Sequence, residues 1–242
     1  FTHRPIAIGD RASLWTYLDW MLSASSNAAA SIVIREALLM MHFGSAYPVS
    51  ETASEDFLAK TPRQDLSDLL KRALQEPVIR NGMAIKHLRQ GGFFTREGKR
   101  QVAGGGLSYA TARGLMQFLV RMEQGQLVDE WSSRALKRLL YMTERRIRYA
   151  SSPALRDAAV YFKSGSLYSC QPEEGFTCGK YKGNKRNYMN SVAIVEAEVD
   201  GRKLHYIVTL VSNVLKENSA LAHQTLATQI HQLIKRRNAP AQ

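Results

Sequence analysis

Two short groups of polar residues carry the hydroxyl, amide and ammonium groups that acyl-transfer chemistry uses. The first is Ser25-Ser26-Asn27, and the second is Lys163-Ser164-Gly165-Ser166. Such chemistry requires a base for the serine proton, a group that protonates the leaving nitrogen, and donors for the oxyanion. Each group alone is a weak signal, because serine and asparagine before an alanine-rich run usually just cap a helix. The two groups become informative when they are considered together, in their order along the chain.

In this order, the two groups resemble the second and third motifs of the penicillin-recognising serine hydrolases, the β-lactamases and D,D-peptidases. Those motifs read S-x-N and K-T-G, and K-S-G is a common variant of the latter. In class A β-lactamases a threonine, two alanines and an asparagine follow the second motif, and here Ala28, Ala29, Ala30 and Ser31 take those places. Ser26 stands where class A enzymes have aspartate, which weakens a class A assignment but not the superfamily one. The resemblance covers nearly the whole chain.

The resemblance implies two catalytic residues in this chain. Ser25 would relay a proton to the leaving amine of the substrate. Lys163 would lie in contact with Ser25 and supply positive potential, which keeps the relay poised and attracts a carboxylate. The implied reaction is hydrolysis or acyl transfer through an acyl-enzyme, on β-lactam or D-alanyl-peptide-like amides.

The same resemblance implies four substrate-binding residues. Asn27 would hydrogen-bond the amide side chain of the substrate, and Ser164 would hydrogen-bond its carboxylate. Gly165 has no Cβ, so the substrate could approach the edge of the strand closely. The backbone N–H of Ser166 would be one oxyanion donor.

The nucleophile that the family requires is not found in these 242 residues. It belongs to the first motif, S-x-x-K, but no serine here has a lysine three places on. In the family this motif and the first two strands of the sheet precede S-x-N by some tens of residues, whereas only 24 residues precede Ser25. We therefore expect these parts upstream of Phe1. A catalytically inactive binding or structural protein with the same fold is the alternative.

A further family residue, the glutamate that activates the deacylating water in class A enzymes, has no good counterpart. Glu97 lies at a loosely comparable place, but the residues around it do not match, and we interpret it as an exposed loop glutamate. This favours a peptidase, esterase or penicillin-binding role over an efficient β-lactamase.

Helical periodicity predicts the elements that must position these residues. A first helix should begin at an Asp10 cap, and a second should cover 28–41 after a polar elbow, capped by Ser26 or Asn27. Irregular chain is expected over 44–65, and a short helix over 65–74 that Pro77 ends. Residues 83–88 could add one helical turn, and the glycine-rich, basic residues 90–106 should form a mobile loop or a β-excursion. Two further helices are expected, from a Ser108 cap to Gly125 and over 130–142.

The second half of the chain changes to strand patterns. Residues 160–169, 189–199 and 204–214 read as strands, and Asp200-Gly201 predicts a tight hairpin turn between the last two. A final helix is expected over 219–235. This order predicts an α+β fold, with a helical layer on an antiparallel sheet. We expect one domain over 1–242, mainly helical over 1–150 and with strands and a closing helix over 151–242.

Charge and composition limit the kinds of partner that this protein is expected to bind. The net charge is +12, which raises the possibility of nucleic-acid binding. The basic residues are scattered and do not alternate with aromatics, so we expect no nucleic-acid partner, and a basic surface attracted to an anionic cell envelope is the simpler interpretation. A nucleic-acid binder remains the rival, with steep salt dependence as its signature. No transmembrane segment is expected, because the apolar runs are too short.

The cysteines and histidines indicate the cellular compartment and whether a metal or cofactor is expected. Cys170 and Cys178 flank a short loop between two extended arms, which favours a disulfide and therefore a periplasmic or secreted protein. Two unrelated thiols are the alternative. The six histidines are dispersed, without metal-ligand spacing, so neither a metal site nor any cofactor is expected.

Overall fold

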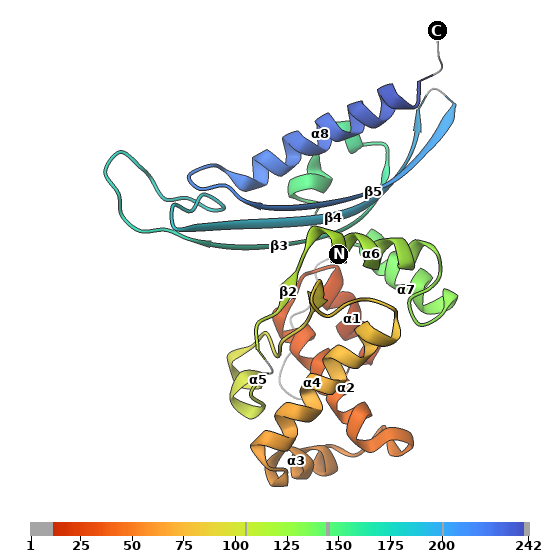
Figure 1. Ribbon diagram of the computed structural model, residues 1–242, viewed down its shortest axis with the longest axis vertical. Helices are drawn as coiled ribbons and strands as arrows, with labels where there is room; N and C mark the ends of the chain where they lie inside the picture. Colours follow the sequence, from red (N-terminus) through yellow and green to blue (C-terminus); the bar gives the residue numbers. More distant parts are fainter. Residues whose placement is uncertain (1–11, 105, 144–145, 200, 240–242) are drawn as a thin grey trace. The chain divides into compact units, whose positions relative to one another are not determined.

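The computed structural model describes residues 12–104, 106–143, 146–199 and 201–239 (Figure 1). Helices are combined with a three-stranded antiparallel sheet, which confirms the predicted α+β class. The described residues form two compact units. The first takes the chain up to Leu74 together with Gly91–Leu107, and the second takes Gln75–Gln90 and the chain from Ser108 onward. The single domain expected over 1–242 stays a prediction.

The first unit is helical. Its α1 is capped by Ser13, whose hydroxyl accepts from Thr16 N, and the Asp10 cap lies outside the described residues. Of the two caps considered for α2, Ser26 is the one found, and its hydroxyl accepts from Ala29 N. The elements are α1 (Leu14–Leu22), α2 (Asn27–Phe43), the 3₁₀ turn η1 (Gly44–Ala46), α3 (Glu51–Lys60), the first part of α4 (Arg63–Arg80), and α5 (Arg96–Gln101).

A compact apolar core holds these helices together. It is built from side chains of α2, α3 and α4 and from the segments on either side of α5. Ser31 of α2 ties this core to the segment before α5, because its buried hydroxyl accepts from the backbone N–H groups of Phe94 and Thr95. The buried core residues are Ile34, Leu38, Leu39, Phe57, Leu58, Leu66, Leu70, Phe93 and Val102.

Three predictions for this region are wrong. Residues 44–65 are not irregular, because α3 and the start of α4 lie there, with α3 capped by Ser50. Pro77 does not end α4, which continues to Arg80, and Asn81 donates to the Pro77 carbonyl from both its backbone and its side chain. Residues 90–106 are not simply a loop, because α5 forms within them after a Thr95 cap.

The second unit is built around a sheet in the order β3-β4-β5, so β3 is an edge strand of the described sheet. A two-residue connection joins β4 to β5, as the Asp200-Gly201 pair predicted, and Gly201 has the left-handed φ of 70° that such turns need. Asp200 lies outside the described residues. The elements are β1 (Leu88–Arg89), β2 (Tyr109–Ala110), α6 (Ala112–Glu123), α7 (Glu130–Tyr141), the 3₁₀ turns η2 (Arg148–Ser151) and η3 (Pro153–Leu155), β3 (Ala159–Ser169), β4 (Arg186–Val199), β5 (Arg202–Asn213) and α8 (Ser219–Arg237).

Helices cover both faces of this sheet (Figure 1). On one face α8 packs against β4 and β5, with η2 and η3 beside it, while α6 contacts β5 and α7 contacts β3 from the other side. The α8 face holds the core, where Tyr149 and Phe162 are fully buried. One local prediction was wrong here, since Thr111 rather than Ser108 caps α6. Within the segment 83–88 the Ala84 carbonyl accepts from the backbone N–H groups of His87 and Leu88, so the single turn expected there is present just before β1. Among the described helices, none combines the length and apolar character needed to cross a bilayer.

Candidate functional site

The Lys163–Ser166 segment lies in the middle of β3, with its side chains alternating between the two faces of the sheet. Phe162 is buried in the α8-side core, and Ser164 and Ser166 follow it on that face. Lys163 and Gly165 therefore point to the opposite face. A Cβ built at Gly165 would meet no atom within 4 Å, so the strand is open at this position. The segment thus offers an uncrowded, polar stretch of an edge strand.

Arg148 binds both hydroxyls on the α8 side of this segment. Its guanidinium donates to Ser164 Oγ over 2.6 Å and to Ser166 Oγ over 3.0 Å. Arg148 is only 8% exposed, and its φ of 60° puts a non-glycine residue in the left-handed region. Strained backbone of this kind is retained where the surrounding structure holds it, often at functional sites. The next residue, Tyr149, is fully buried in the core, which anchors the strained turn.

Sequence reasoning missed Arg148, which it counted among the scattered basic surface residues. No local signal separates it from Arg145 or Arg146 in the printed sequence. What distinguishes Arg148 is its burial against β3, and this depends on the packing of η2 between the sheet and α8. A buried arginine next to two serines supplies a charged, hydrogen-bonding surface suited to an anion.

Lys163 has a perturbed environment. Burial, with a smaller contribution from the positive charge of Arg148, lowers the pKa of Lys163 to about 8. Its ammonium donates to the carbonyl oxygen of Ser164 over 2.9 Å. A lysine with such a pKa exchanges protons near neutral pH, as acid–base chemistry requires.

A buried polar layer continues from Ser164 across the sheet. Ser164 pairs with Ser191 on β4, whose hydroxyl lies 3.0 Å from His223 Nδ1. The other ring nitrogen of His223 lies 2.9 Å from Ser212 Oγ on β5. Burial, and then the charge of Arg148, lowers the pKa of His223 to about 4. The imidazole is therefore neutral at pH 7, and it ties α8 to β4 and β5.

The Ser25–Asn27 elbow lies in the first unit, where the predicted turn between two helices is found. Ser25 has a φ of 57°, again left-handed for a non-glycine residue, and the Ser26 N–H donates to the Trp20 carbonyl. Ser25 and Asn27 are both exposed. The structure thus places these two residues on one unit and the Lys163–Ser166 segment on the other, and their convergence on one cleft stays a prediction.

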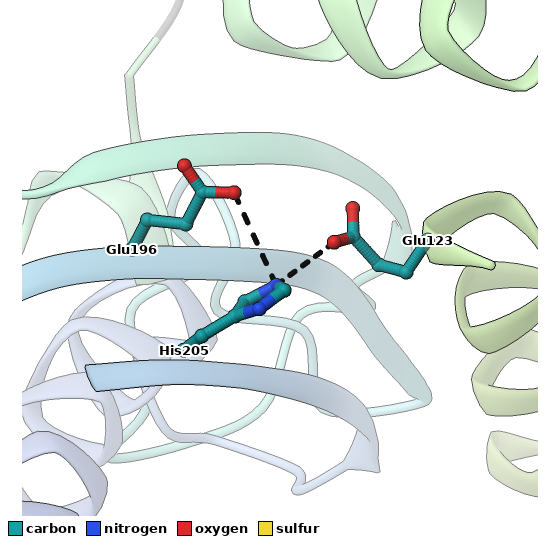
Figure 2. A group of neighbouring side chains, drawn as sticks. All are labelled: Glu123, Glu196 and His205. Carbon is teal, nitrogen blue, oxygen red and sulfur yellow. Dashed lines mark ion pairs between the residues drawn. The ribbon is translucent and has the colours of Figure 1, made fainter. Parts of the chain in front are cut away.

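One cluster of possible metal ligands is present although the histidines are dispersed in sequence. Glu196 on β4 and His205 on β5 are cross-strand partners, and Glu123 at the end of α6 faces them (Figure 2). His205 Nε2 lies 2.9 Å from Glu123 and 4.0 Å from Glu196. The ammonium of Lys137 lies 2.8 Å from Glu123 and 2.6 Å from Glu196. The lysine thus already supplies a cation to both carboxylates.

Two further sequence predictions concern the cysteine pair and Glu97. Cys170 and Cys178 form a disulfide within the β3–β4 connection, as the two extended arms predicted. Glu97 lies in the first turn of α5, is exposed and pairs with Arg100. The expected exposure of Glu97 is therefore confirmed, whereas its expected place in a loop is wrong, because the residue belongs to a helix.

Comparison with known proteins identifies the architecture. No family model matches the sequence, and no curated protein matches it either. Solved structures do match: the TLA-3 extended-spectrum β-lactamase superposes with a TM-score of 0.55 over 93% of this chain, at 12% identity. A class A β-lactamase from Bacteroides cellulosilyticus gives 0.52 over 92% of the chain, at 17% identity. The fold is β-lactamase-like.

The chain spans less than two thirds of these solved structures, 64% of the first and 62% of the second. A β-lactamase-like fold was the architecture that the two motifs implied, and this part of the resemblance is confirmed. At 12% to 17% identity this similarity shows the fold alone, because one fold can carry many different activities.

Proposed function

We propose that this chain is the substrate-binding part of a penicillin-recognising serine hydrolase or acyltransferase. Its substrates are β-lactam or D-alanyl-peptide-like amides, and the reaction passes through an acyl-enzyme. The observation that carries the proposal is the contact of buried Arg148 with Ser164 and Ser166, next to Lys163 on the open edge strand β3. These substrates share a carboxylate close to the scissile amide, and this segment has the charge and the donors for it.

The carboxylate binds at Ser164 on the edge of β3, with Arg148 on the α8 face of the strand and Lys163 on the opposite face. Arg148 fixes the Ser164 hydroxyl from behind through a 2.6 Å hydrogen bond, and Lys163 adds positive potential. Because both cations are partly or fully buried, their field is less screened than that of surface lysines. Gly165 leaves room for the substrate backbone along the strand, and the Ser166 N–H serves as an oxyanion donor.

Proton transfer to the leaving nitrogen runs through Ser25, with Lys163 as its partner and Asn27 as the ligand of the substrate amide. The lowered pKa of Lys163, about 8, supports this role. A neighbour with that pKa can take and return a proton at neutral pH, whereas an ordinary lysine would stay charged. The left-handed backbone at Ser25 fits a residue held for function rather than for helix capping, which Ser26 performs.

The compartment follows from the same proposal. Cell-wall peptides lie outside the cytoplasm, and the Cys170–Cys178 disulfide is stable in an oxidising compartment such as the periplasm or the extracellular space. A periplasmic or secreted protein that contacts peptidoglycan-like peptides is the consistent assignment.

Covalent labelling tests the proposal. The full product of the gene is incubated with a fluorescent penicillin and resolved by denaturing electrophoresis. We expect a labelled band that unlabelled penicillin competes away, and a band at least tenfold weaker for Lys163→Met. The matched control is Lys203→Met, which removes an exposed lysine of β5 and should label like the wild type. Absence of labelling together with absence of β-lactam or thioester turnover would overturn the proposal.

The second candidate is a catalytically inactive protein that binds the same ligands without acylation. The observation in its favour is that no serine among the 242 residues has a lysine three places on. Equilibrium binding separates the two: reversible binding of a penicillin that denaturation releases completely supports the inactive protein. An adduct that survives denaturation supports the hydrolase.

A further inference from the structure

An open pocket of about 520 Å³ lies beside Arg148 within the second unit. Its walls come from three segments: η2 with the two residues before it, the end of the β3–β4 connection at Lys180 and Tyr181, and the first turns of α8. Leu221 and Gln224 represent α8 in this wall. Nothing in the proposed reaction uses this space.

The charge of the pocket is one-sided. Among the described residues that line it, Arg146, Arg148 and Lys180 are cationic and none is acidic. By contrast, Lys137 in the same unit is paired with two carboxylates, those of Glu123 and Glu196. Like charges gathered in a hollow without counter-charges create a potential that attracts anions.

The wall formed by Tyr181 is held in place. The Tyr181 carbonyl accepts from both the backbone N–H and the hydroxyl of Ser219, at 3.0 and 3.1 Å. The Gly183 carbonyl accepts from Lys216 N, and the Asn184 side chain bonds both the N–H and the carbonyl of Gln171 across the connection. The pocket is therefore preformed by hydrogen bonds rather than by loose loop contacts.

Arg148 connects this pocket to the serines of β3. Its guanidinium bonds Ser164 and Ser166, and its central carbon lies 4.8 Å from the centre of the Tyr181 ring. The ammonium of Lys180 lies 5.3 Å from the same ring. Arg148, and to a smaller extent Lys180, lowers the pKa of the Tyr181 phenol, as expected where the local potential is positive. Only the Arg148 side chain therefore separates a ligand bound at Ser164 from the other two cations of the pocket, Arg146 and Lys180.

We infer that this pocket binds a second acidic group of the substrate, so that the protein prefers amides whose leaving portion carries two carboxylates. The inference rests on the proposed function, because Ser164 must hold the first carboxylate. The second carboxylate pairs with Lys180 and Arg146 at the rim, while the aliphatic part of the ligand lies against Leu221 and Tyr181.

The test compares two ligands of nearly equal size. N-acetyl-D-alanyl-D-glutamate and N-acetyl-D-alanyl-D-glutamine differ by one carboxylate, and their binding to the protein is measured by calorimetry at low and at physiological salt. We expect the glutamate ligand to bind about fivefold more tightly at low salt, the factor for about 1 kcal/mol of charge pairing. The preference should shrink as salt rises.

Variants locate the effect. Lys180→Gln and Arg146→Gln should each reduce the preference for the glutamate ligand toward equality. Lys182→Gln removes the same charge from the same connection, but Lys182 lies over the Phe176 ring and does not line the pocket, so the preference should persist. Equal binding of both ligands by the wild type, or a preference that survives Lys180→Gln with Arg146→Gln, overturns the inference and leaves the proposed function standing. If neither ligand binds and no penicillin labels the protein, both fail together.

Discussion

The guanidinium of Arg148 and the hydroxyl of Ser164 form a 2.6 Å hydrogen bond between a strained turn and the edge strand β3. This bond places a buried positive charge directly behind the serine that the sequence motif assigns to carboxylate binding. Ser164 is therefore one part of a charged unit that also includes Ser166.

Removing this charge should weaken ligand binding. Arg148→Gln keeps a donor but loses the charge, and hydrogen bonds that involve charged groups contribute about 1.5–3 kcal/mol. We expect the dissociation constant of a fluorescent penicillin to rise about tenfold or more. Fluorescence polarisation measures it, with exposed Arg156→Gln as the control of equal charge change. Unchanged affinity for Arg148→Gln, with an intact thermal transition, would contradict the role of Arg148.

The lowered pKa of Lys163 should appear in the pH dependence of binding. Because this pKa is about 8 instead of 10.5, the ammonium loses its proton as pH rises through 8. Affinity for a carboxylate ligand should therefore be highest below pH 7 and should fall between pH 7.5 and 9. Titrations of the wild type and Lys163→Arg over pH 6–10 check this, since an arginine keeps its charge throughout the range. A flat profile for both proteins would exclude Lys163 from the site.

Burial of His223 should make the protein sensitive to acid. Its folded pKa of about 4 lies below the ordinary value of 6.5, so between these values the unfolded chain takes up a proton that the folded protein does not. Stability is therefore lost as pH falls from 6.5 to 4, by about 3 kcal/mol. Urea unfolding at pH 7 and pH 4.5 measures the loss. His223→Gln should be less stable at pH 7 but lose less on acidification, and an identical loss in both proteins would contradict this account.

Lys137 should act as the built-in cation of the Glu123–Glu196–His205 cluster. Although burial opposes it, hydrogen bonds to Glu123 and Glu196 raise the pKa of Lys137, so the ammonium stays charged. Lys137→Ala leaves two carboxylates and an imidazole whose ligand atoms lie within 4.8 Å of one another. We expect this variant to lose about 1–3 kcal/mol of stability, because Glu123 is mostly buried.

Zinc should substitute for the missing ammonium. Thermal unfolding with and without Zn²⁺ should show stabilisation of Lys137→Ala by several degrees and little effect on the wild type. The matched control is Arg134→Ala, which removes an exposed cation from the same helix. Equal stabilisation of the wild type would mean that the ammonium does not compete with the metal.

The sequence by itself determined the local features of this protein. Helical and strand periodicity located α2, α7, α8 and the three long strands, because an apolar face must recur at the period of its element. The elbow at Ser25 and the strand at Lys163 were placed for the same reason, and two cysteines eight residues apart between extended arms predicted the disulfide.

Only the tertiary structure decided what depends on distant contacts. Arg148 became a buried partner of Ser164 because η2 packs between the sheet and α8, and nothing near it in sequence reports that packing. Glu123 meets Glu196 and His205, 73 and 82 positions further along the chain, because the register of β4 and β5 and the end of α6 bring the three side chains together.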